Sequence, residues 1–268
     1  SRFYHCRSMP LSSFAWLGSS GRNANRMALT SNSSPVNNKK DPDFDEEAQK
    51  IFASLGLGKE GSSSRYNSCD PIWKHPRTGG TIYVGNVEAA SNMDILKNKN
   101  ISHVVNCTDN MPLYHQKSSS ISYYRFDIAS WWRHVKDDTD SVIEFTQSVF
   151  AFVGEALAAG KNVRKVTAVR DCSLCSCVLA SGCCSSSHDM FVPQVLIHCL
   201  AGAHRAGTTG CALLMHFGGL DTKAAIAVAK RLRPVIDPIG TLPELLKKIE
   251  KANKLKSPKE RFPIAHFE

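Results

Sequence analysis

The chain has 268 residues, of which 42% are hydrophobic, and its formal net charge is +9 at pH 7. This composition is typical of a soluble globular protein, and we identify no apolar stretch of about 18 residues, so we expect no membrane span. Residues 1–40 contain six basic residues and no acidic one, which accounts for +6 of the charge. Because most of the basicity lies outside the presumed domain, we expect no nucleic-acid partner.

The N-terminal region, residues 1–75, is predicted to be a flexible, basic segment that contains one short amphipathic helix. Residues 1–40 are rich in Ser and Asn, a composition that fits either disorder or an organelle-targeting presequence. The localisation therefore stays open; composition favours an intracellular, cytoplasmic protein, with an organelle as the alternative. Apolar residues at helical spacing between 43 and 55 predict a helix that packs on the following domain. Docking of a partner is the alternative role for this helix.

From residue 81 onward, strand and helix patterns alternate along the chain. Strands are predicted at 81–85, 101–107, 122–128 and 194–199, helices at 88–98 and 140–159, and three further helices after the last strand. Asp140 is expected to cap the helix at 140–159, and a capping box opens the last helix at Thr241. The alternation predicts an α/β domain with a central, mostly parallel sheet of four to five strands flanked by helices.

Residues 164–195 interrupt this pattern. They hold five of the ten cysteines of the chain, and deleting them would join Val163 directly to Leu196. One interpretation is a genuine loop that binds a metal through Cys172, Cys175 and their neighbours. The other, which we favour, is a retained intron or a gene-model error. We therefore predict a domain over 76–256 with this insert, no metal site, and a tail at 257–268.

The most informative residues are 198–205, in which five residues separate Cys199 from Arg205. A phosphate monoester is bound by converging N–H donors and a bidentate cation, beside a nucleophile aligned with the scissile bond. A predicted strand ends at Cys199 and a predicted helix follows Arg205, so the loop lies at a helix N-terminus. Free N–H groups and the helix dipole there favour a bound anion and the thiolate form of cysteine.

Two further residues suit a phosphate-binding loop. Gly202 permits a positive φ where the loop must turn its amides inward, and Arg205 has a planar fork that can hold two phosphate oxygens. A cysteine and an arginine at this spacing also recur by chance, and most such cysteines are core residues. The order of strand, loop and helix favours the functional interpretation, with Cys199 as nucleophile. The predicted phosphate-binding residues are Leu200, Ala201, Gly202, Ala203, His204 and Arg205.

This run resembles His-Cys-x-x-Gly-x-x-Arg, the motif of the dual-specificity branch of the cysteine-based protein tyrosine phosphatases. Segments at 81–86, 101–108 and 233–238 also resemble that family, so the resemblance covers about residues 80–255. It implies a phosphatase-like domain that hydrolyses phosphotyrosine, phosphoserine and phosphothreonine in proteins through a phosphocysteine, without metal or organic cofactor. It further implies that His198 orients the loop; a satisfied core histidine is the alternative. We expect a monomer that acts on a phosphorylated protein; a phosphoprotein-binding module without useful turnover is the alternative.

The sequence departs from the family at the proton donor. The family takes its donor from an Asp on the loop before the helix at 140. Alignment with the end of the preceding strand puts Ser130 at the position of that Asp. Counting back from the helix instead puts Asp137 and Asp138 near it. We prefer Asp138 or Asp137 as general acid, because repulsion between neighbouring carboxylates can raise the pKa of one of them. A solvated loop carboxylate or a helix cap is the alternative for each.

The sequence also departs from the family directly after the arginine, where Ala206 replaces the usual Ser or Thr. The hydroxyl of Thr208 or Thr209 is a candidate substitute. The loop contains no lysine, which favours a phosphoprotein over a phosphoinositide substrate. Residues 131–134, Trp-Trp-Arg-His, are interpreted as a substrate-facing loop, with burial of one Trp in the core as the alternative.

Overall fold

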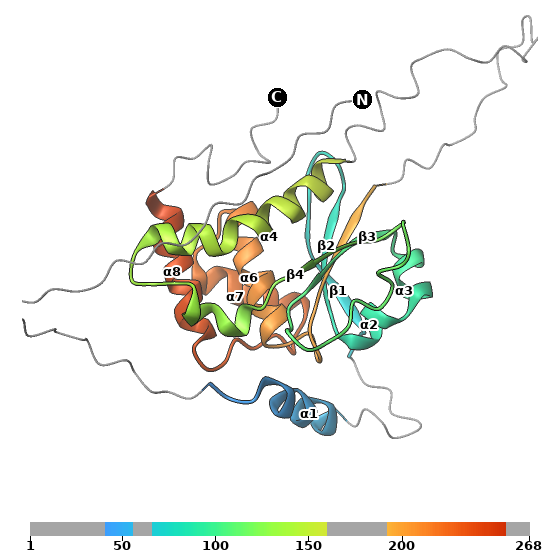
Figure 1. The fold of residues 1–268 in the computed structure, drawn as a ribbon, viewed down its shortest axis with the longest axis horizontal. Coiled ribbons are helices and arrows are strands. Elements are labelled where there is room, and N and C mark those ends of the chain that lie inside the picture. The colour runs from blue at the N-terminus through green and yellow to red at the C-terminus, as the bar shows by residue number, and fades with distance from the viewer. Residues whose placement is uncertain (1–40, 56–65, 160–191, 256–268) are drawn as a thin grey trace, which may run out of the picture. The chain divides into compact units, whose positions relative to one another are not determined.

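The structure of the protein is a computed structural model that describes residues 41–55, 66–159 and 192–255. Figure 1 shows the chain coloured from blue at the N-terminus to red at the C-terminus. The predictions for residues 1–40, for most of the insert and for the tail lie outside the described residues. The expected helix at 43–55 is confirmed as α1 (Phe44–Ser54), and Asp43 caps its N-terminus.

Five strands form one sheet in the order β1-β2-β5-β3-β4. All pairs are parallel except β1 with β2, which confirms the mostly parallel α/β sheet. β5, the strand that leads to Cys199, is therefore central, and parallel neighbours cover both of its edges. The strands are β1 (Cys69–Lys74), β2 (Thr81–Gly85), β3 (Ile101–Asn106), β4 (Ser122–Arg125) and β5 (Gln194–His198).

The strand β1 was not predicted from the sequence, and it precedes the predicted domain start at residue 76. This strand lies at the sheet edge and contains Pro71, where the register against β2 shifts. Proline cannot donate to a strand ladder, so within a sheet it is confined to an edge or a bulge. β1 has both features, which explains why its sequence does not follow a regular strand pattern.

Helices cover both faces of the sheet (Figure 1). Each side has its own apolar core: a large one involving α4, α6, α7 and α8, and a smaller one involving α2 and α3. The predicted helix at 88–98 is two helices, because Asn92 ends the first and its side chain caps the second. The helices are α2 (Val87–Ser91), α3 (Met93–Asn98), the 3-10 helix η1 (Ile128–Arg133), α4 (Thr139–Ala159), α6 (Arg205–Gly218), α7 (Thr222–Leu232) and α8 (Leu242–Leu255).

The helix α4 corrects two expectations. It is capped by Asp138, whose Oδ1 accepts the Ser141 N–H at 2.7 Å, and not by Asp140. It is also long and apolar enough, by length and composition alone, to cross a membrane, although we expected no such stretch. Its apolar face, however, is buried in the core, and α4 packs on α8, β3 and β5. In this structure α4 is therefore a core helix of the α/β domain.

The end of the predicted insert belongs to the central strand. Val195 pairs with Ile82 of β2, and the Gln194 side chain accepts the Thr81 N–H at 2.7 Å. Gln194 and Val195 thus supply the first two residues of β5, at the end opposite the Cys199 loop. Every residue of β5 from 194 onward pairs with a neighbouring strand. The last residues of the insert thus fill the strand positions that Asn162 and Val163 would fill without the insert.

This register makes the insert testable by deletion of residues 164–195. In that variant Val163 would take the place of Val195, and Asn162 that of Gln194. We expect cooperative unfolding and a free energy of unfolding equal to that of the full chain or up to about 1 kcal/mol higher, because a shorter loop costs less closure entropy. Urea denaturation followed by circular dichroism measures this. Loss of the cooperative transition would show that the domain needs the segment.

Candidate active site

The loop from Cys199 to His204 connects the central strand β5 to the helix α6, which begins at Arg205. Cys199 and Arg205 are both buried, with 3% and 5% of their surface exposed. His204 occupies the N-cap position, and its side chain makes no capping hydrogen bond. The first-turn N–H groups of α6 are therefore not satisfied by the usual side-chain cap, which leaves them directed at the loop.

The carbonyl groups of this loop point outward and accept hydrogen bonds from the surrounding protein. A trans peptide places its N–H opposite its C=O, so outward carbonyls turn the following N–H groups to the inside of the loop. The acceptor and donor pairs are Leu200 with Val87 N (3.0 Å), Ala201 with Arg233 Nη2 (3.1 Å) and the Tyr66 hydroxyl, Gly202 with Arg233 Nε (3.0 Å), and Ala203 with Asp237 N (3.2 Å).

The inward N–H groups have no protein partner in the part of the chain that the structure describes. Across residues 200–205, no backbone N–H donates to an acceptor among residues 41–55, 66–159 and 192–255. Buried backbone donors are almost always paired, and a concave set of free N–H groups at a helix N-terminus favours an anion. The predicted phosphate-binding residues thus form one loop with the geometry of an anion site.

Gly202 is required by the path of this loop. Its φ is 66°, as the sequence analysis expected, a conformation that side chains rarely adopt. A Cβ at this position would also collide with the carbonyl group of Gly85 and lie 2.9 Å from Arg233 Nη2. The loop therefore crosses directly over β2 at a distance that only glycine allows.

Arg233 fixes the loop and was missed as a functional residue, since the sequence showed it only as part of a closing segment. It is 1% exposed, and its guanidinium also donates to Asn67 O (2.9 Å) and to Asp70 (2.6 Å). The Tyr66 ring lies 4.9 Å from its charged carbon. A buried arginine needs all of its donors paired, and here two of them hold carbonyls of the phosphate-binding loop. Arg233 is a positioning residue.

Arg205 faces an acidic partner that the sequence analysis did not foresee. Its Nη2 pairs with the carboxylate of Asp45, which comes from α1. Its Nε is buried and has no hydrogen-bond partner among the described residues. The aromatic ring of Phe44 lies 5.6 Å from the guanidinium carbon. One donor of the planar fork is thus occupied by a carboxylate and another is unpaired.

The two histidines of the loop differ in their surroundings. His198 is 1% exposed, and burial lowers its pKa to about 4, so it is neutral at pH 7. Its backbone carbonyl accepts the Cys107 N–H at 2.8 Å. His204 Nδ1 lies 2.6 Å from the carbonyl oxygen of Asp237 and must carry the proton there, because a carbonyl only accepts. His204 thereby links the loop to the segment before α8.

The two general-acid candidates lie at the N-terminus of α4. Asp137 is fully exposed and pairs with Lys248 at 2.7 Å, which lowers its pKa. Hydrogen bonds from Ser141 lower the pKa of Asp138. The expectation that mutual repulsion raises one of these pKa values is wrong, because each carboxylate has its own stabilising partner. Neither is hydrogen-bonded to the loop at 199–205.

The hydroxyls proposed to replace the missing one at Ala206 are engaged elsewhere. Thr208 Oγ1 donates to His204 O at 2.7 Å, and Thr209 Oγ1 donates to Arg205 O at 3.0 Å. Thr209 also accepts from the Cys107 thiol at 3.3 Å. Within the described residues, no hydroxyl donates to Cys199 Sγ, so this arrangement does not supply the expected substitute.

The segment at 131–134 places one Trp in the core and its other three residues at the surface. Trp131 is 4% exposed, and its indole N–H donates to Thr241 Oγ1 at 2.9 Å, so the alternative that one Trp fills the core is confirmed. Trp132 is 56% exposed and lies against Arg133, whose guanidinium carbon is 5.0 Å from the indole ring. His134 stacks on Phe145 of α4.

The relatives of the chain are dual-specificity phosphatases. No protein-family model matches it. It is 26% identical over 159 residues to dual specificity protein phosphatase Mpk3 of Drosophila melanogaster. This match covers 59% of the chain and 29% of that protein. It is 24% identical over 199 residues to human dual specificity protein phosphatase 9. This match covers 73% of the chain and 41% of that protein. Both relatives are named as dual specificity protein phosphatases, and the chain is similar to them over more than half of its length.

The chain spans less than half the length of these two relatives. Among solved structures, it resembles a leucine rich repeat and phosphatase domain containing protein from Entamoeba histolytica, with a TM-score of 0.44, 19% identity and coverage of 71% of this chain and 96% of that one. It also resembles DUSP15, with a TM-score of 0.44, 18% identity and coverage of 70% and 92%.

The buried side chain of His198 predicts that the folded protein is sensitive to acid. Between pH 6.5, the ordinary pKa of His, and pH 4, the unfolded chain binds a proton that the folded chain does not. Stability is therefore lost as pH falls through this window, by about 3 kcal/mol from His198 alone. Urea unfolding at pH 7.5 and 4.5 should show a smaller acid-induced loss for His198→Gln than for the wild type. Equal losses would contradict the assignment.

Proposed function

We propose that this protein is a protein phosphatase that hydrolyses phosphotyrosine, and also phosphoserine and phosphothreonine, through a phosphocysteine intermediate. The observation that carries the proposal is the set of unpaired backbone N–H groups of residues 201–204, turned to the inside of the loop that runs from Cys199 to Arg205, together with the unpaired Nε of Arg205. Such a set of donors matches a phosphoryl dianion better than a neutral ligand. The curated relatives, all named as protein phosphatases, support the same chemistry.

The proposed first step transfers the phosphoryl group to sulfur. The loop N–H groups and Arg205 hold the equatorial oxygens, and Cys199 Sγ attacks phosphorus in line with the ester oxygen. A sulfur–phosphorus bond forms as the phosphorus–oxygen bond breaks. The departing phenol or alcohol takes its proton from a general acid. Because the donors are already held by outward carbonyl bonds, they need little reorganisation when charge develops.

The proposed second step returns the enzyme to its starting state. Water attacks phosphorus and gives a proton to the general acid, which is a carboxylate after the first step; the sulfur–phosphorus bond breaks, and inorganic phosphate leaves with Cys199 again a thiolate. No hydroxyl among the described residues is aimed at this sulfur, since Thr208 and Thr209 donate to carbonyls one turn earlier. We therefore infer that breakdown of the phosphocysteine is slower than its formation.

A phosphorylated protein is the substrate class that the loop favours. Apart from Arg205, its one side chain that can carry positive charge is His204, and it contains no lysine. A phosphoinositide carries several phosphates, which call for several cations around one loop. A single dianionic side chain needs only the donors that this loop offers.

The proposal predicts the loss of hydrolysis in Cys199→Ser and in Arg205→Lys. An aryl phosphate assay should show kcat/KM lower by about 10³-fold or more in each, because the nucleophile or the bidentate clamp is removed. Cys211→Ala is the matched control: Cys211 is a buried thiol in the middle of α6, and its loss should leave kcat/KM within a few-fold. Phosphopeptide binding by a wild type that does not hydrolyse would instead support the binding module.

The general acid is tested separately, because Asp138 and Asp137 stay predictions. For a substrate with a poor leaving group, loss of the proton donor should lower kcat about 10²-fold, and much less for a good leaving group. Asp138→Asn and Asp137→Asn are compared on two aryl phosphates whose leaving phenols differ in pKa. The variant with the leaving-group-dependent loss identifies the donor. If both keep the wild-type kcat on both substrates, neither residue is the acid.

A further inference from the structure

The helix α1 lies on the phosphate-binding loop. Its Ala48 is 2% exposed and packs with Ala201 and Ala203, two of the loop residues. The chain before α1 is fixed at Asp41, whose carboxylate accepts the backbone N–H and the hydroxyl of Thr241 at 2.8 and 3.0 Å. One turn of the helix thus covers the loop, while its N-terminal end is tied to the segment before α8.

This placement brings the first turn of α1 to Arg205. Asp45 is 36% exposed, whereas Arg205 is 5% exposed, so the carboxylate reaches inward to the buried guanidinium. The second carboxylate oxygen of Asp45 accepts from Asn110 Nδ2 at 3.3 Å. Phe44 lies beside the same guanidinium. A negative charge, held from two sides, is therefore bound to the cation on which the proposed phosphate site depends.

We propose that α1 is an internal competitor of the substrate, in which the Asp45 carboxylate takes the place of a phosphoryl oxygen on Arg205. The proposal rests on the proposed function, since it assigns a regulatory element to the same anion site. A carboxylate and a phosphoryl dianion on one guanidinium repel each other. Binding of the substrate therefore requires Asp45 to leave Arg205, and α1 to shift with it.

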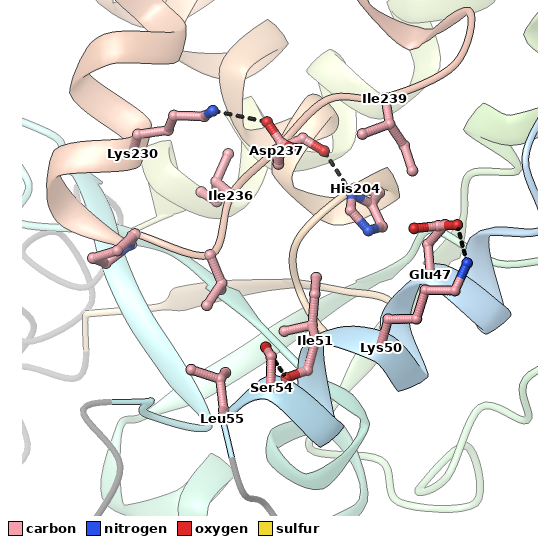
Figure 2. A pocket seen from close by; sticks show the side chains of 12 residues that line it. Glu47, Lys50, Ile51, Ser54, Leu55, His204, Lys230, Ile236, Asp237 and Ile239 are labelled. Atoms are coloured by element: carbon pink, nitrogen blue, oxygen red, sulfur yellow. Dashed lines mark hydrogen bonds and ion pairs between the residues drawn. The ribbon is translucent and has the colours of Figure 1, made fainter.

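The contacts of α1 beyond this first turn permit such a shift. Figure 2 shows a cleft between α1 and the segment at 234–239, with Ile51 on one side and His204 on the other. The two ion pairs at its walls are internal to each side: Lys50 pairs with Glu47, and Lys230 with Asp237. No ion pair between described residues crosses this cleft. The second half of the helix is thus held mainly by the apolar contacts of Ile51 and Phe52, which carry no charge to oppose a shift.

Competition of this kind lowers the apparent affinity of the site in proportion to the time that α1 is seated. If Asp45 occupies Arg205 nine-tenths of the time, the apparent Kd of an oxyanion is raised about tenfold over its intrinsic value. Displacement of α1 by a partner or by substrate contacts would remove this effect. The same contact thus makes the phosphatase site weak towards free phosphate and responsive to whatever moves α1.

The test measures tungstate binding by isothermal titration calorimetry to the full chain. Asp45→Asn keeps the shape of the side chain and removes its charge, so we expect an apparent Kd about tenfold lower than in the wild type. Glu46→Gln is the matched control: it makes the same charge change one residue further on, at a side chain that is 67% exposed and pairs with Lys50. Its Kd should stay within twofold of the wild type.

Hydrogen exchange supplies a second measurement. Tungstate should speed amide exchange in residues 44–54 of the wild type, because the oxyanion displaces Asp45 and loosens α1. An unchanged Kd in Asp45→Asn, or slower exchange of α1 with tungstate, would overturn the proposal and leave the phosphatase site intact. A lower kcat in Asp45→Asn would also overturn it, since it would make Asp45 a participant in the reaction. Failure of every variant to bind tungstate would refute the anion site itself.

Discussion

The site depends on the way in which Arg233 and its neighbours hold the carbonyl groups of the phosphate-binding loop. A loop of successive peptides has no reason of its own to direct every N–H to one side. Here the donors outside the loop fix Leu200 to Ala203 with their carbonyls outward, so the N–H groups face inward by the planarity of the peptide. The contacts on the outside of the loop thus set the direction of the N–H groups on its inside. None of these contacts involves a ligand.

The hydrogen bonds from Arg233 to the loop also limit which residues can stand at the positions around it. Arg233 can approach the loop only because position 202 lacks a side chain, and its own charge is balanced by Asp70 of the edge strand β1. The edge strand is therefore part of the support of the site, although it stands two strands away from β5. A buried cation with all its partners in place keeps the loop in one conformation, whereas removal of Asp70 would leave a buried unpaired charge.

The sequence predicted what is local and missed what comes from distant segments. Cys199, Gly202 and Arg205 stand within one turn-forming loop between a strand and a helix, so their types and spacing were enough to propose an anion site. Arg233 lies 31 residues from its acceptor Gly202, and Asp45 lies 160 residues from Arg205. No periodicity in the chain links such pairs. Asp138 could not be assigned one role from the sequence, because a carboxylate before a helix serves equally well as a cap and as a candidate proton donor.

The surroundings of Asp137 and Asp138 bear on whether either residue can be the proton donor. Asp137 and Asp138 are held ionised by a lysine and by hydrogen bonds from Ser141, and a proton donor must instead be protonated when the substrate binds. A phosphoryl dianion brought near a carboxylate raises the pKa of that carboxylate by repulsion. Donation by either residue would therefore require its contact with Lys248 or with Ser141 to break when the substrate binds. If the proposed function and the proposed role of α1 both hold, substrate binding would change two acidic segments: Asp137 or Asp138 would lose its contact at the N-terminus of α4, and Asp45 of α1 would leave Arg205.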